Sequence, residues 1–459
     1  LEVTWNFAHY FAPVFRGLQA LQLAEDRYLV PDYTDFVAHF RSQESFQRRH
    51  ELLASLGLEI KGEIPLLLAV LVEPGAQSHL AWDEWSGYSD AHLFLEPNWI
   101  TQAWALPING LAVPWYLDYA RVPGAQAVTL GSQNVRIAVL DSGLGEGVLP
   151  ESVQVVPGYN FIGKNYNTHD DYAEAHGTKI SQLISEVMPV ATLQPVKVLD
   201  SAGYGTDFSV SEGILFAAGL HSIPNPTPCQ IINMSLGQKA QSELLRKQVE
   251  AVATQSDVVM IAASGNTPRG IYTPGIFHPA AYPQVVAVGA ITPAPDGPQR
   301  ADYSHYGPNL DLTAPPSNLL GTSFSTAIVS GVAGLMLANG AAPGDVQRIL
   351  TRTATDIGAP GWDQEHGYGL VNGEWAVKNI SVLRFQVTNS AGELMQEDIS
   401  LEVTSKRLFL PPGEYEVEAW VNVQNGPEPG PGDYLVQSKV FVSENQQQEL
   451  SLTLEEIGP

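Results

Sequence analysis

Short apolar runs alternate with longer segments of helical spacing through the middle of the chain, from about residue 134 to residue 338. The apolar runs are rich in β-branched residues, as expected for strands buried on both faces. They are "VRIAVLD", "ATLQPVKVLD", "QIINMSL", "DVVMIAAS" and "QVVAVGA". Helical segments such as "HGTKISQLISEV" and "DFSVSEGILFAAGL" separate them. This alternation predicts an α/β fold, a doubly wound parallel sheet with helices on both faces, whose functional residues gather beyond the carboxyl ends of the strands.

The regions on either side have different patterns. Ahead of the alternating region, "IPLLLAVLVE" is too short for an ordinary helix, whereas "ESFQRRHELLASL" has apolar residues near helical spacing, so we expect a small α+β domain. Past residue 380 apolar and polar residues alternate along the chain, as in "GEYEVEAWVNV". This alternation predicts an all-β domain, a small sandwich. The expected division is an N-terminal extension at 1–26, the α+β domain at 27–104, the α/β domain at 113–380 and the all-β domain at 381–459.

Charge and composition exclude several classes of partner. The chain of 459 residues has 49 acidic and 23 basic residues, a net charge of -26, which argues against nucleic acid and anionic membranes as partners. No apolar run reaches the ~18 residues of a membrane span, and residues 1–26 contain no recognisable signal peptide. The single cysteine, Cys229, excludes an internal disulfide and is expected to be a buried structural thiol.

Four polar residues stand where the predicted strands give way to turns and helices. Asp141 ends "VRIAVLD", His176 begins a helix, Asn266 follows "VVMIAASG", and Ser323 opens the helix of "GTSFSTAIVSG". Each motif alone is weak, because Gly, Asn and Ser are common turn and cap residues. Together they supply what acyl transfer needs: a hydroxyl nucleophile, a base to accept its proton, an acid to orient the base, and an amide donor for the oxyanion.

At these residues the chain resembles the subtilisin-like serine proteases, or subtilases. The resemblance extends from about residue 113 to residue 376 and rests on nine segments in family order: "IAVLDSG", "HGT", "VKVLDSAGYG", "INMSLG", "AASGN", "YPQVVAVGA", "YSHYGP", "GTSFSTA" and "TATDIGAPGWDQEHGYGLVN". It implies a sheet of the subtilisin type, a catalytic triad of Asp141, His176 and Ser323, and Asn266 as oxyanion donor. The substrate-binding residues that it implies are Gly203, Tyr204, Gly205, Ser235, Leu236, Gly237, Ala262, Ala263, Ser264 and Gly265.

The resemblance extends to the neighbouring domains and to maturation. Residues 27–104 resemble the family's propeptide, an intramolecular chaperone and inhibitor, down to the closing "LEPN". The stretch "ITQAWALPINGLAVPW" that follows has no clear hydrophobic period, so we expect it to lie extended in the cleft and to be cut in cis between Trp99 and Ala112. The all-β region resembles appendages of some bacterial subtilases. By the same resemblance we expect a secreted protein that acts on proteins or peptides.

The sequence departs from the family in four places. Lys179 stands where a second histidine is usual, and Ala327 replaces a common proline after the nucleophile. The segment before Ser323 is short, which predicts a more open leaving-group side. "HGTKISQLISEVMPVATL" leaves no room for the family's calcium loop, and the acidic pair Asp170–Asp171, the nearest substitute, is expected to be a solvated loop. The chemistry requires no cofactor, while structural calcium at an unidentified site remains open.

Three functions are compatible with the motifs. The first is an active endopeptidase made as a self-inhibited precursor, which the intact triad favours. The second is a catalytically silent subtilase fold that serves as a binding module. The third is a protease for one dedicated protein substrate, with the N-terminal domain retained as a lock. The sequence does not separate the third from a protease of broad specificity.

Overall fold

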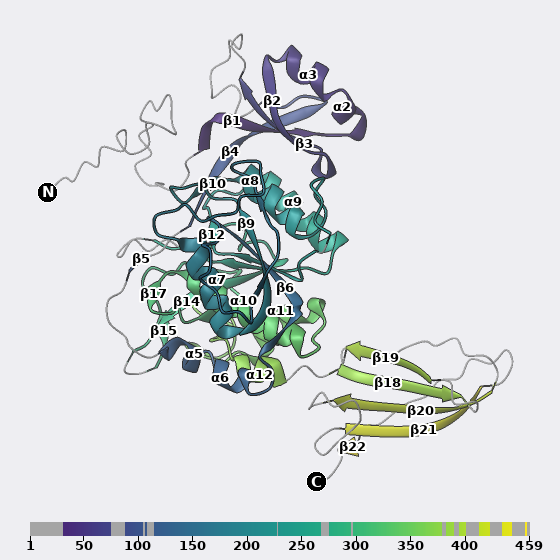
Figure 1. The fold of residues 1–459 in the computed structure, drawn as a ribbon. Helices are drawn as coiled ribbons and strands as arrows, with labels where there is room; N and C mark the ends of the chain where they lie inside the picture. The colour runs from purple at the N-terminus through teal and green to yellow at the C-terminus, as the bar shows by residue number, and fades with distance from the viewer. Residues whose placement is uncertain are drawn as a thin grey trace.

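The computed structural model describes residues 31–74, 88–103, 106–107, 114–226, 228–267, 275–294, 297–378, 382–389, 394–400, 413–422, 434–442 and 455–456 (Figure 1). The expected extension at 1–26 lies outside these residues.

A nine-stranded sheet forms the centre of the main body, in the order β15-β14-β13-β11-β6-β9-β7, with β16 beside β14 and β8 beside β9. All of its pairings are parallel except that of β14 with β15, as the apolar, β-branched strands predict. The strands are β6 (Gly131–Asp141), β7 (Gln154–Val155), β8 (Tyr159–Asn160), β9 (Val190–Lys197), β11 (Ile231–Met234), β13 (Val259–Ala263), β14 (Val285–Thr292), β15 (Gln299–Arg300) and β16 (Leu312–Ala314).

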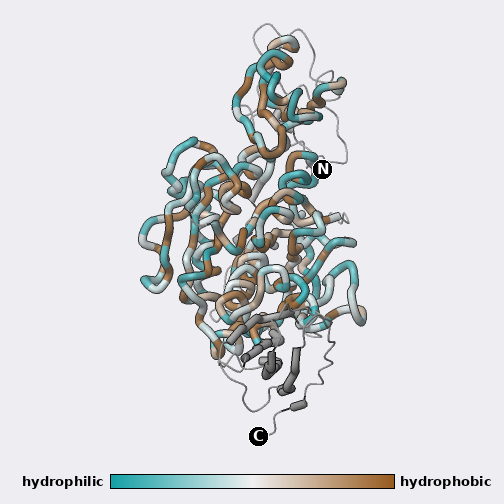
Figure 2. The backbone as a smooth tube through the Cα atoms, turned by 90° about the vertical axis from the view of Figure 1, so that its right-hand side faces the viewer, coloured by the Kyte–Doolittle hydropathy of each residue, from teal (hydrophilic) through white to brown (hydrophobic). Residues whose placement is uncertain are grey.

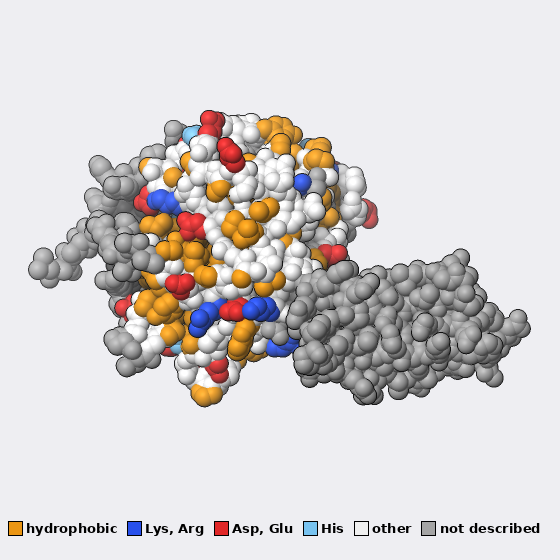
Figure 3. All heavy atoms as spheres, turned by 60° about the horizontal axis from the view of Figure 1, so that its bottom comes forward, with side chains coloured by type: hydrophobic (Ala, Val, Ile, Leu, Met, Phe, Trp, Pro, Cys, Tyr) orange, Lys and Arg blue, Asp and Glu red, His pale blue; other side chains and the backbone are white. Residues whose placement is uncertain are grey.

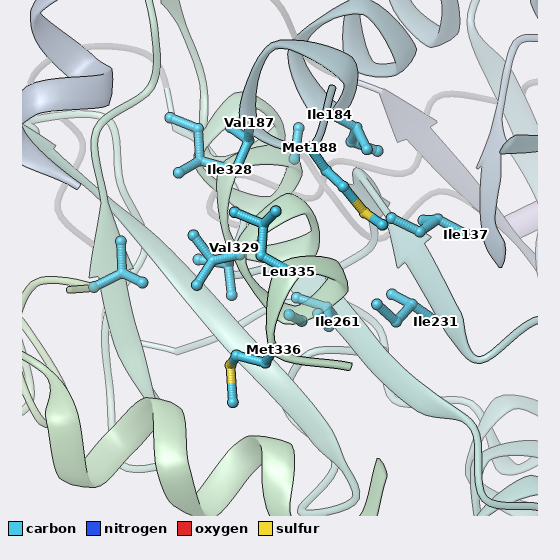
Figure 4. Packing of buried hydrophobic residues seen from close by; sticks show 14 of the residues in the cluster. Ile137, Ile184, Val187, Met188, Ile231, Ile261, Ile328, Val329, Leu335 and Met336 are labelled. Atoms are coloured by element: carbon cyan, nitrogen blue, oxygen red, sulfur yellow. The ribbon is translucent and has the colours of Figure 1, made fainter. Parts of the chain in front are cut away.

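Helices cover both faces of this sheet, because successive strand residues point to opposite sides. Ile137 of β6 belongs to the buried cluster beneath α7 and α10, whereas its neighbour Ala138 belongs to the cluster beneath α8 and α9. Figure 4 shows the first cluster, in which side chains of α10 pack against those of β6, β11 and β13. The helices are α5 (Trp115–Tyr119), α6 (Val122–Gln126), α7 (His176–Val187), α8 (Asp207–Ala217), α9 (Glu243–Gln255), α10 (Thr322–Ala338), α11 (Val346–Thr353) and α12 (Gly373–Lys378).

The N-terminal module, residues 31–103, stands on one end of the main body (Figures 1 and 2). Its strands are β1 (Pro31–Phe40), β2 (Leu58–Ile64), β3 (Ala69–Pro74) and β4 (Leu93–Ala103). The helix expected over "ESFQRRHELLASL" is two short helices, α2 (Gln43–Gln47) and α3 (Arg49–Ser55), which meet at Arg48. "IPLLLAVLVE" is not one strand, because a 3-10 turn at Pro65–Leu67 and a left-handed Leu68 separate the end of β2 from β3.

The main body reaches into the sheet of this module. That sheet has the order β10-β4-β1-β3-β2, and β12 also pairs with β4. The strands β10 (Tyr204–Thr206) and β12 (Leu236–Gly237) belong to the main body, so β4 is the strand that joins the sheet of the module to the main body.

In the C-terminal region the described residues form one antiparallel sheet in the order β19-β18-β20-β21-β22. Its strands are β18 (Val382–Asn389), β19 (Leu394–Ser400), β20 (Gly413–Asn422), β21 (Tyr434–Val442) and β22 (Glu455–Glu456). The prediction of a sandwich, with two sheets, is not met within these residues. Alternation along a strand identifies a face that prefers burial but does not identify the layer that covers it.

Acidic, basic and hydrophobic side chains are interspersed on the face of the main body in Figure 3, so the net negative charge is not gathered there. Among the described helices, none is long and apolar enough to cross a bilayer.

Candidate active site

The first part of the site is a buried acid–base pair. Asp141 is the last residue of β6 and His176 is the first of α7, and neither side chain is exposed to solvent. His176 Nδ1 lies 2.8 Å from Asp141 Oδ1 and 2.9 Å from Oδ2. The glycine after the histidine permits this approach, because a β-carbon at Gly177 would collide with the backbone of Gly143. The carboxylate therefore fixes the imidazole with Nδ1 engaged and Nε2 available for a proton.

Neighbouring groups fix the carboxylate in turn. The backbone N–H of Ser142 donates to Asp141 Oδ1 at 2.8 Å, and the Ser142 hydroxyl accepts from the N–H of Gly177 at 3.0 Å. Lys197, which ends β9 beside Asp141, is 3% exposed and donates from Nζ to the Ser142 carbonyl at 2.6 Å. Lys197 was not among the residues expected from the sequence. The only signal was its place opposite Asp141 at the end of the adjacent strand.

The nucleophile candidate lies at the start of α10. Gly321, with φ 142°, precedes the helix, and Ser323 is its second residue, 2% exposed. The Ser323 hydroxyl donates to the Ser235 carbonyl at 2.9 Å, and the Ser235 hydroxyl donates to the Ser323 carbonyl at 2.8 Å. Among the described residues His176 Nε2 has no hydrogen-bond partner. Transfer of the hydroxyl proton to Nε2 would require the hydroxyl to turn away from the Ser235 carbonyl, and active-site hydrogen bonds often close only with substrate bound.

Hydrogen bonds from Thr322 set the orientation of the Asn266 side-chain amide. Its Oδ1 accepts from the Thr322 backbone N–H at 2.9 Å and from the Thr322 hydroxyl at 3.1 Å. With Oδ1 held by the residue before Ser323, the Nδ2 amide is the donor left for a ligand. The structure thus gathers Asp141, His176, Asn266 and Ser323, the four residues singled out by the sequence, at the strand ends.

Strand β4 occupies the groove between two of the segments expected to bind substrate. In antiparallel register, Tyr204 faces Gln102 and Gly205 faces Thr101, while Leu236 faces Ala103 and Gly237 faces Gln102. Gly203, with φ 80°, turns the chain just ahead of β10, and Ser235 lies just ahead of β12.

The N-terminal part of the chain makes a second strand pairing with the main body, just ahead of α10. The short strand β5 (Leu106–Pro107) is antiparallel to β17 (Leu319–Leu320), which directly precedes Gly321. The N-terminal chain therefore pairs with the main body on both sides of the nucleophile candidate.

The remaining segment expected to bind substrate is buried at the end of β13. Ala262, Ala263 and Ser264 are at most 3% exposed, and the Ser264 hydroxyl donates to the His305 carbonyl at 3.0 Å. Gly265 has φ 106°, and a β-carbon there would lie 2.6 Å from the Phe277 ring. Its N–H donates to the Thr322 hydroxyl at 3.3 Å, which links this segment to the start of α10.

Two residues of "LEPN" cap helices of the main body, a role that the sequence analysis did not assign. The Glu96 carboxylate accepts from the backbone N–H groups of Glu243 and Leu244 at the start of α9, at 3.0 and 2.8 Å. Asn98 Oδ1 accepts from the N–H of Phe208 at the start of α8, at 3.2 Å. The first N–H groups of a helix have no partner within it, so β4 supplies acceptors that both helices lack.

Asp170 and Asp171 serve the structure around the base. Asp170, expected in a solvated loop, is buried instead, and its Oδ2 accepts from the N–H and the hydroxyl of Thr178 at 3.0 and 2.6 Å in the first turn of α7. Asp171 pairs with Lys197 at 2.8 Å. No group of three or more His, Cys, Asp or Glu in the described residues could hold a metal ion. Cys229 is buried as expected, and burial raises the pKa of its thiol.

Comparison with known proteins decides the family. The model of the subtilase family matches residues 132–369, more than half of the chain. The chain is 32% identical to Subtilisin Savinase of Lederbergia lenta over 292 residues, which cover 58% of this chain and 99% of that protein. Alkaline elastase YaB of Bacillus sp. (strain YaB) is 33% identical over 291 residues, covering 58% of this chain and 70% of that protein. The chain belongs to the subtilase family.

A solved structure extends the likeness in fold beyond the subtilase core. Fervidolysin from Fervidobacterium pennivorans, a keratinolytic enzyme related to subtilisin, matches with a TM-score of 0.62 at 18% identity. The match covers 86% of this chain and 71% of that one. The fold class expected from the sequence is confirmed, and the protein is a subtilisin-like serine peptidase.

Proposed function

We propose that this subtilase is an endopeptidase that cuts proteins through Asp141, His176 and Ser323, with Asn266 as oxyanion donor. The observation that carries the proposal is the buried pair of Asp141 and His176 at the strand ends. The imidazole of the pair lies 5.8 Å, between ring centroids, from Phe324, the residue after Ser323 in α10. A serine hydroxyl is a weak nucleophile until a base accepts its proton, and a buried carboxylate both orients that base and stabilises its protonated form.

In this mechanism the Ser323 oxygen attacks the substrate carbonyl carbon while His176 Nε2 takes the hydroxyl proton. The carbonyl oxygen becomes an oxyanion, which Asn266 Nδ2 and a backbone N–H at the start of α10 stabilise. His176 then gives the proton to the leaving amine, and the C–N bond breaks. A water molecule, deprotonated by the same imidazole, hydrolyses the acyl ester and restores Ser323.

We propose further that residues 27–104 form an intramolecular inhibitor that is removed by cleavage in cis. The pairing of β4 with β10 and β12, and of β5 with β17, supports this proposal. Trp104 and Ala105, between those strands, lie outside the described residues. The pairing of β4 ends at Ala103 opposite Leu236, next to Ser235, whose carbonyl accepts from Ser323. We therefore expect cleavage of the bond between Trp104 and Ala105.

Substrates would enter the same groove once β4 has left it. The backbones of Gly203–Gly205 and Ser235–Gly237 would pair with an extended substrate, and Ala262–Gly265 would line the pocket for the residue before the cut bond. Acyl transfer by serine needs no metal, so brief chelation is expected to leave initial turnover unchanged. We propose an extracellular site of action by analogy with the family.

The test compares wild type with Ser323→Ala. Wild type should hydrolyse peptides, react with a fluorophosphonate and release a chain that begins at Ala105, as intact mass and N-terminal sequencing would show. The variant should do none of these. Peptidase activity without cleavage of the chain would refute the self-inhibited precursor but not the endopeptidase function. A wild-type protein that is inert in every assay would favour the binding module instead.

A further inference from the structure

Two polar side chains are buried in the apolar layer between the central sheet and α10. Asn233 lies on β11 two residues after Ile231, so the two side chains point to the same face of the sheet. Ser330 directly follows Val329 on α10 and, like Asn233, is 0% exposed. Ile231 and Val329 belong to the hydrophobic cluster shown in Figure 4. Burying a polar group in such a layer is unfavourable unless it gains hydrogen bonds, so the partners of Asn233 and Ser330 indicate what they do.

The hydrogen bonds of these two side chains lead to the nucleophile candidate. The Ser330 hydroxyl donates to Asn233 Oδ1 at 2.9 Å, and Asn233 Nδ2 donates to Ser235 Oγ at 3.0 Å. The Ser235 hydroxyl in turn donates to the Ser323 carbonyl at 2.8 Å. Each bond sets the direction of the next. With Oδ1 engaged by Ser330, Asn233 presents its amide to Ser235, and a hydroxyl oxygen that accepts from an amide directs its own hydrogen elsewhere.

This hydrogen-bond chain begins and ends on the same helix. Ser323 and Ser330 are separated by about two helical turns, so they lie on the same face of α10. Asn233, between them in the chain of hydrogen bonds, lies on β11, whose backbone pairs with β6 on one side and β13 on the other. The hydrogen bonds therefore tie the first turn of α10 to a central strand of the sheet.

The position of that first turn matters for the proposed reaction. It sets how far the Ser323 hydroxyl lies from His176 Nε2 and from the substrate carbonyl, and a displacement of about 1 Å can lower a rate by roughly a hundredfold. Asp141 and His176 are held by other hydrogen bonds, which do not include Asn233 or Ser330. Loss of the hydrogen-bond chain should therefore move the nucleophile and leave the acid–base pair in place.

We infer that Asn233 is a positioning residue for the nucleophile, which holds the main chain of Ser323 through the hydroxyl of Ser235. Ser330 assists by fixing the orientation of the Asn233 amide. Neither Asn233 nor Ser330 contacts the reacting atoms, so both act only through the place that they give to Ser323. The inference rests on the proposed endopeptidase function and adds to it two buried residues outside the triad and the groove.

The main test is the double variant Asn233→Leu/Ser330→Ala, compared with wild type as processed enzymes. It removes both polar groups together, and replacing two hydrogen-bond partners by apolar groups of similar shape changes stability little. We expect kcat to fall roughly ten- to hundredfold with KM unchanged, because the nucleophile is displaced while the groove is intact. The rate of reaction with a fluorophosphonate should fall in parallel, and the unfolding temperature should stay close to that of wild type.

A second experiment asks whether Asn233 acts through Ser235. Ser235→Ala removes the hydroxyl that contacts the Ser323 carbonyl and should itself lower kcat. In the Ser235→Ala background, the double variant should lower kcat no further, because the last hydrogen bond of the chain is already missing. Additive losses would show that Asn233 and Ser330 act by another route, such as packing, and would overturn the inference. Where the double variant does not fold, Ser330→Ala alone serves in the same cycle.

The matched control is Ser185→Ala, which removes another buried helix hydroxyl. Ser185 lies on α7 and donates to the Gln182 carbonyl at 2.6 Å, so its variant should keep the wild-type kcat. The pH dependence of kcat/KM should be the same in every variant, because the pair of Asp141 and His176 is untouched. A wild-type kcat in the double variant, or a changed pH dependence, would overturn the positioning role while leaving the endopeptidase intact. A wild type without peptidase activity would instead count against the proposed function.

Discussion

The N-terminal module and the main body bury their hydrophobic residues very differently. The main body has a large cluster on each face of its sheet, whereas the module's own cluster contains ten buried residues between its sheet and its short helices. The other face of the module's sheet is not independent, because Val37, Ile64 and Ala69 are part of the cluster beneath α8 and α9. A domain of this size buries little surface of its own, so the module gains stability from the surface on which it sits.

Strand β4 makes several of the polar contacts between the two parts. This strand fills the groove, and its Glu96 and Asn98 cap α9 and α8. In the main body, by contrast, Asp141, His176 and Asn266 are held by hydrogen bonds within the main body itself. The difference teaches that the hydrogen bonds around these three side chains come from the main body alone, while one face of the module's sheet is buried against the main body. Each prediction below tests one side of that asymmetry.

The largest effect is expected from Ser323→Ala. Loss of the nucleophile of a triad lowers kcat by a factor on the order of 10⁶, so peptide hydrolysis and cleavage in cis should both disappear. The full-length chain should persist because the module remains a bound but uncut strand. Intact mass and fluorophosphonate labelling measure both outcomes.

Ser325→Ala is the matched control for that loss. Ser325 is buried two residues further along α10, and its hydroxyl donates to the Ala314 carbonyl at 2.8 Å. Its variant should still be cut and labelled. A Ser323→Ala chain that is processed as fast as wild type would contradict the assignment of the nucleophile.

The next largest effect is expected at Asn266. Removal of an oxyanion donor lowers kcat by roughly 10²–10³, with little change in KM, because the donor acts on the transition state. Asn266→Ala also removes the acceptor for Thr322, so Asn266→Asp is the sharper variant, since it keeps the acceptor and loses the amide donor. Steady-state kinetics should show a similar fall in kcat for both. Wild-type kcat in Asn266→Asp would rule out the donor role.

Much of the main body could be predicted from the sequence, because its signals are local. The β-branched runs identified the strands, and their common edge brought Asp141, His176, Asn266 and Ser323 together. The contacts that the sequence did not predict depend on distant pairings. Lys197 is identified only by its pairing with Asp141 on the adjacent strand, and the two caps only by the place of β4 against the starts of α9 and α8. In the C-terminal region the sequence predicted β20 and β21, but not β18, β19 or the single layer that the described strands form.

A smaller effect is expected when Glu96 is changed. In Glu96→Gln, an amide N–H₂ group replaces one of the two carboxylate oxygens that accept from the backbone N–H groups at the start of α9. The variant therefore loses a helix-capping hydrogen bond, and loss of a cap lowers stability by about 1 kcal/mol. The module should leave several-fold faster after cleavage, which would shorten the lag before full peptidase activity.

The control is Glu59→Gln, on the exposed part of β2. It should keep the wild-type lag, and the final peptidase activity should be the same in all three proteins once the module is gone. An unchanged lag in Glu96→Gln would mean that the cap does not hold the module on the main body.

The smallest effect concerns pH and again separates the two parts. The pKa of Asp207 in the precursor is raised, chiefly by burial and further by Glu96 of the module. A carboxyl whose pKa is raised on folding binds its proton more tightly in the folded chain. Its stabilising contribution is therefore complete below the ordinary aspartate value, about 3.9, and is lost as pH rises through the raised value.

The unfolding temperature of the Ser323→Ala precursor should therefore fall across that range, and by less when Asp207→Asn is added, because asparagine does not titrate. Other groups titrate in both proteins, so the difference between the two curves is the quantity to measure. Glu212→Gln in the same background should follow the parent curve. Glu96 leaves with the module, so the difference between the two curves should be smaller in the processed enzyme. Part of the pH dependence would then arise from the contact between the module and the main body. Parallel curves for the precursor with and without Asp207 would show that its carboxyl does not become ionised in this range, and would remove the electrostatic part of the asymmetry between module and main body.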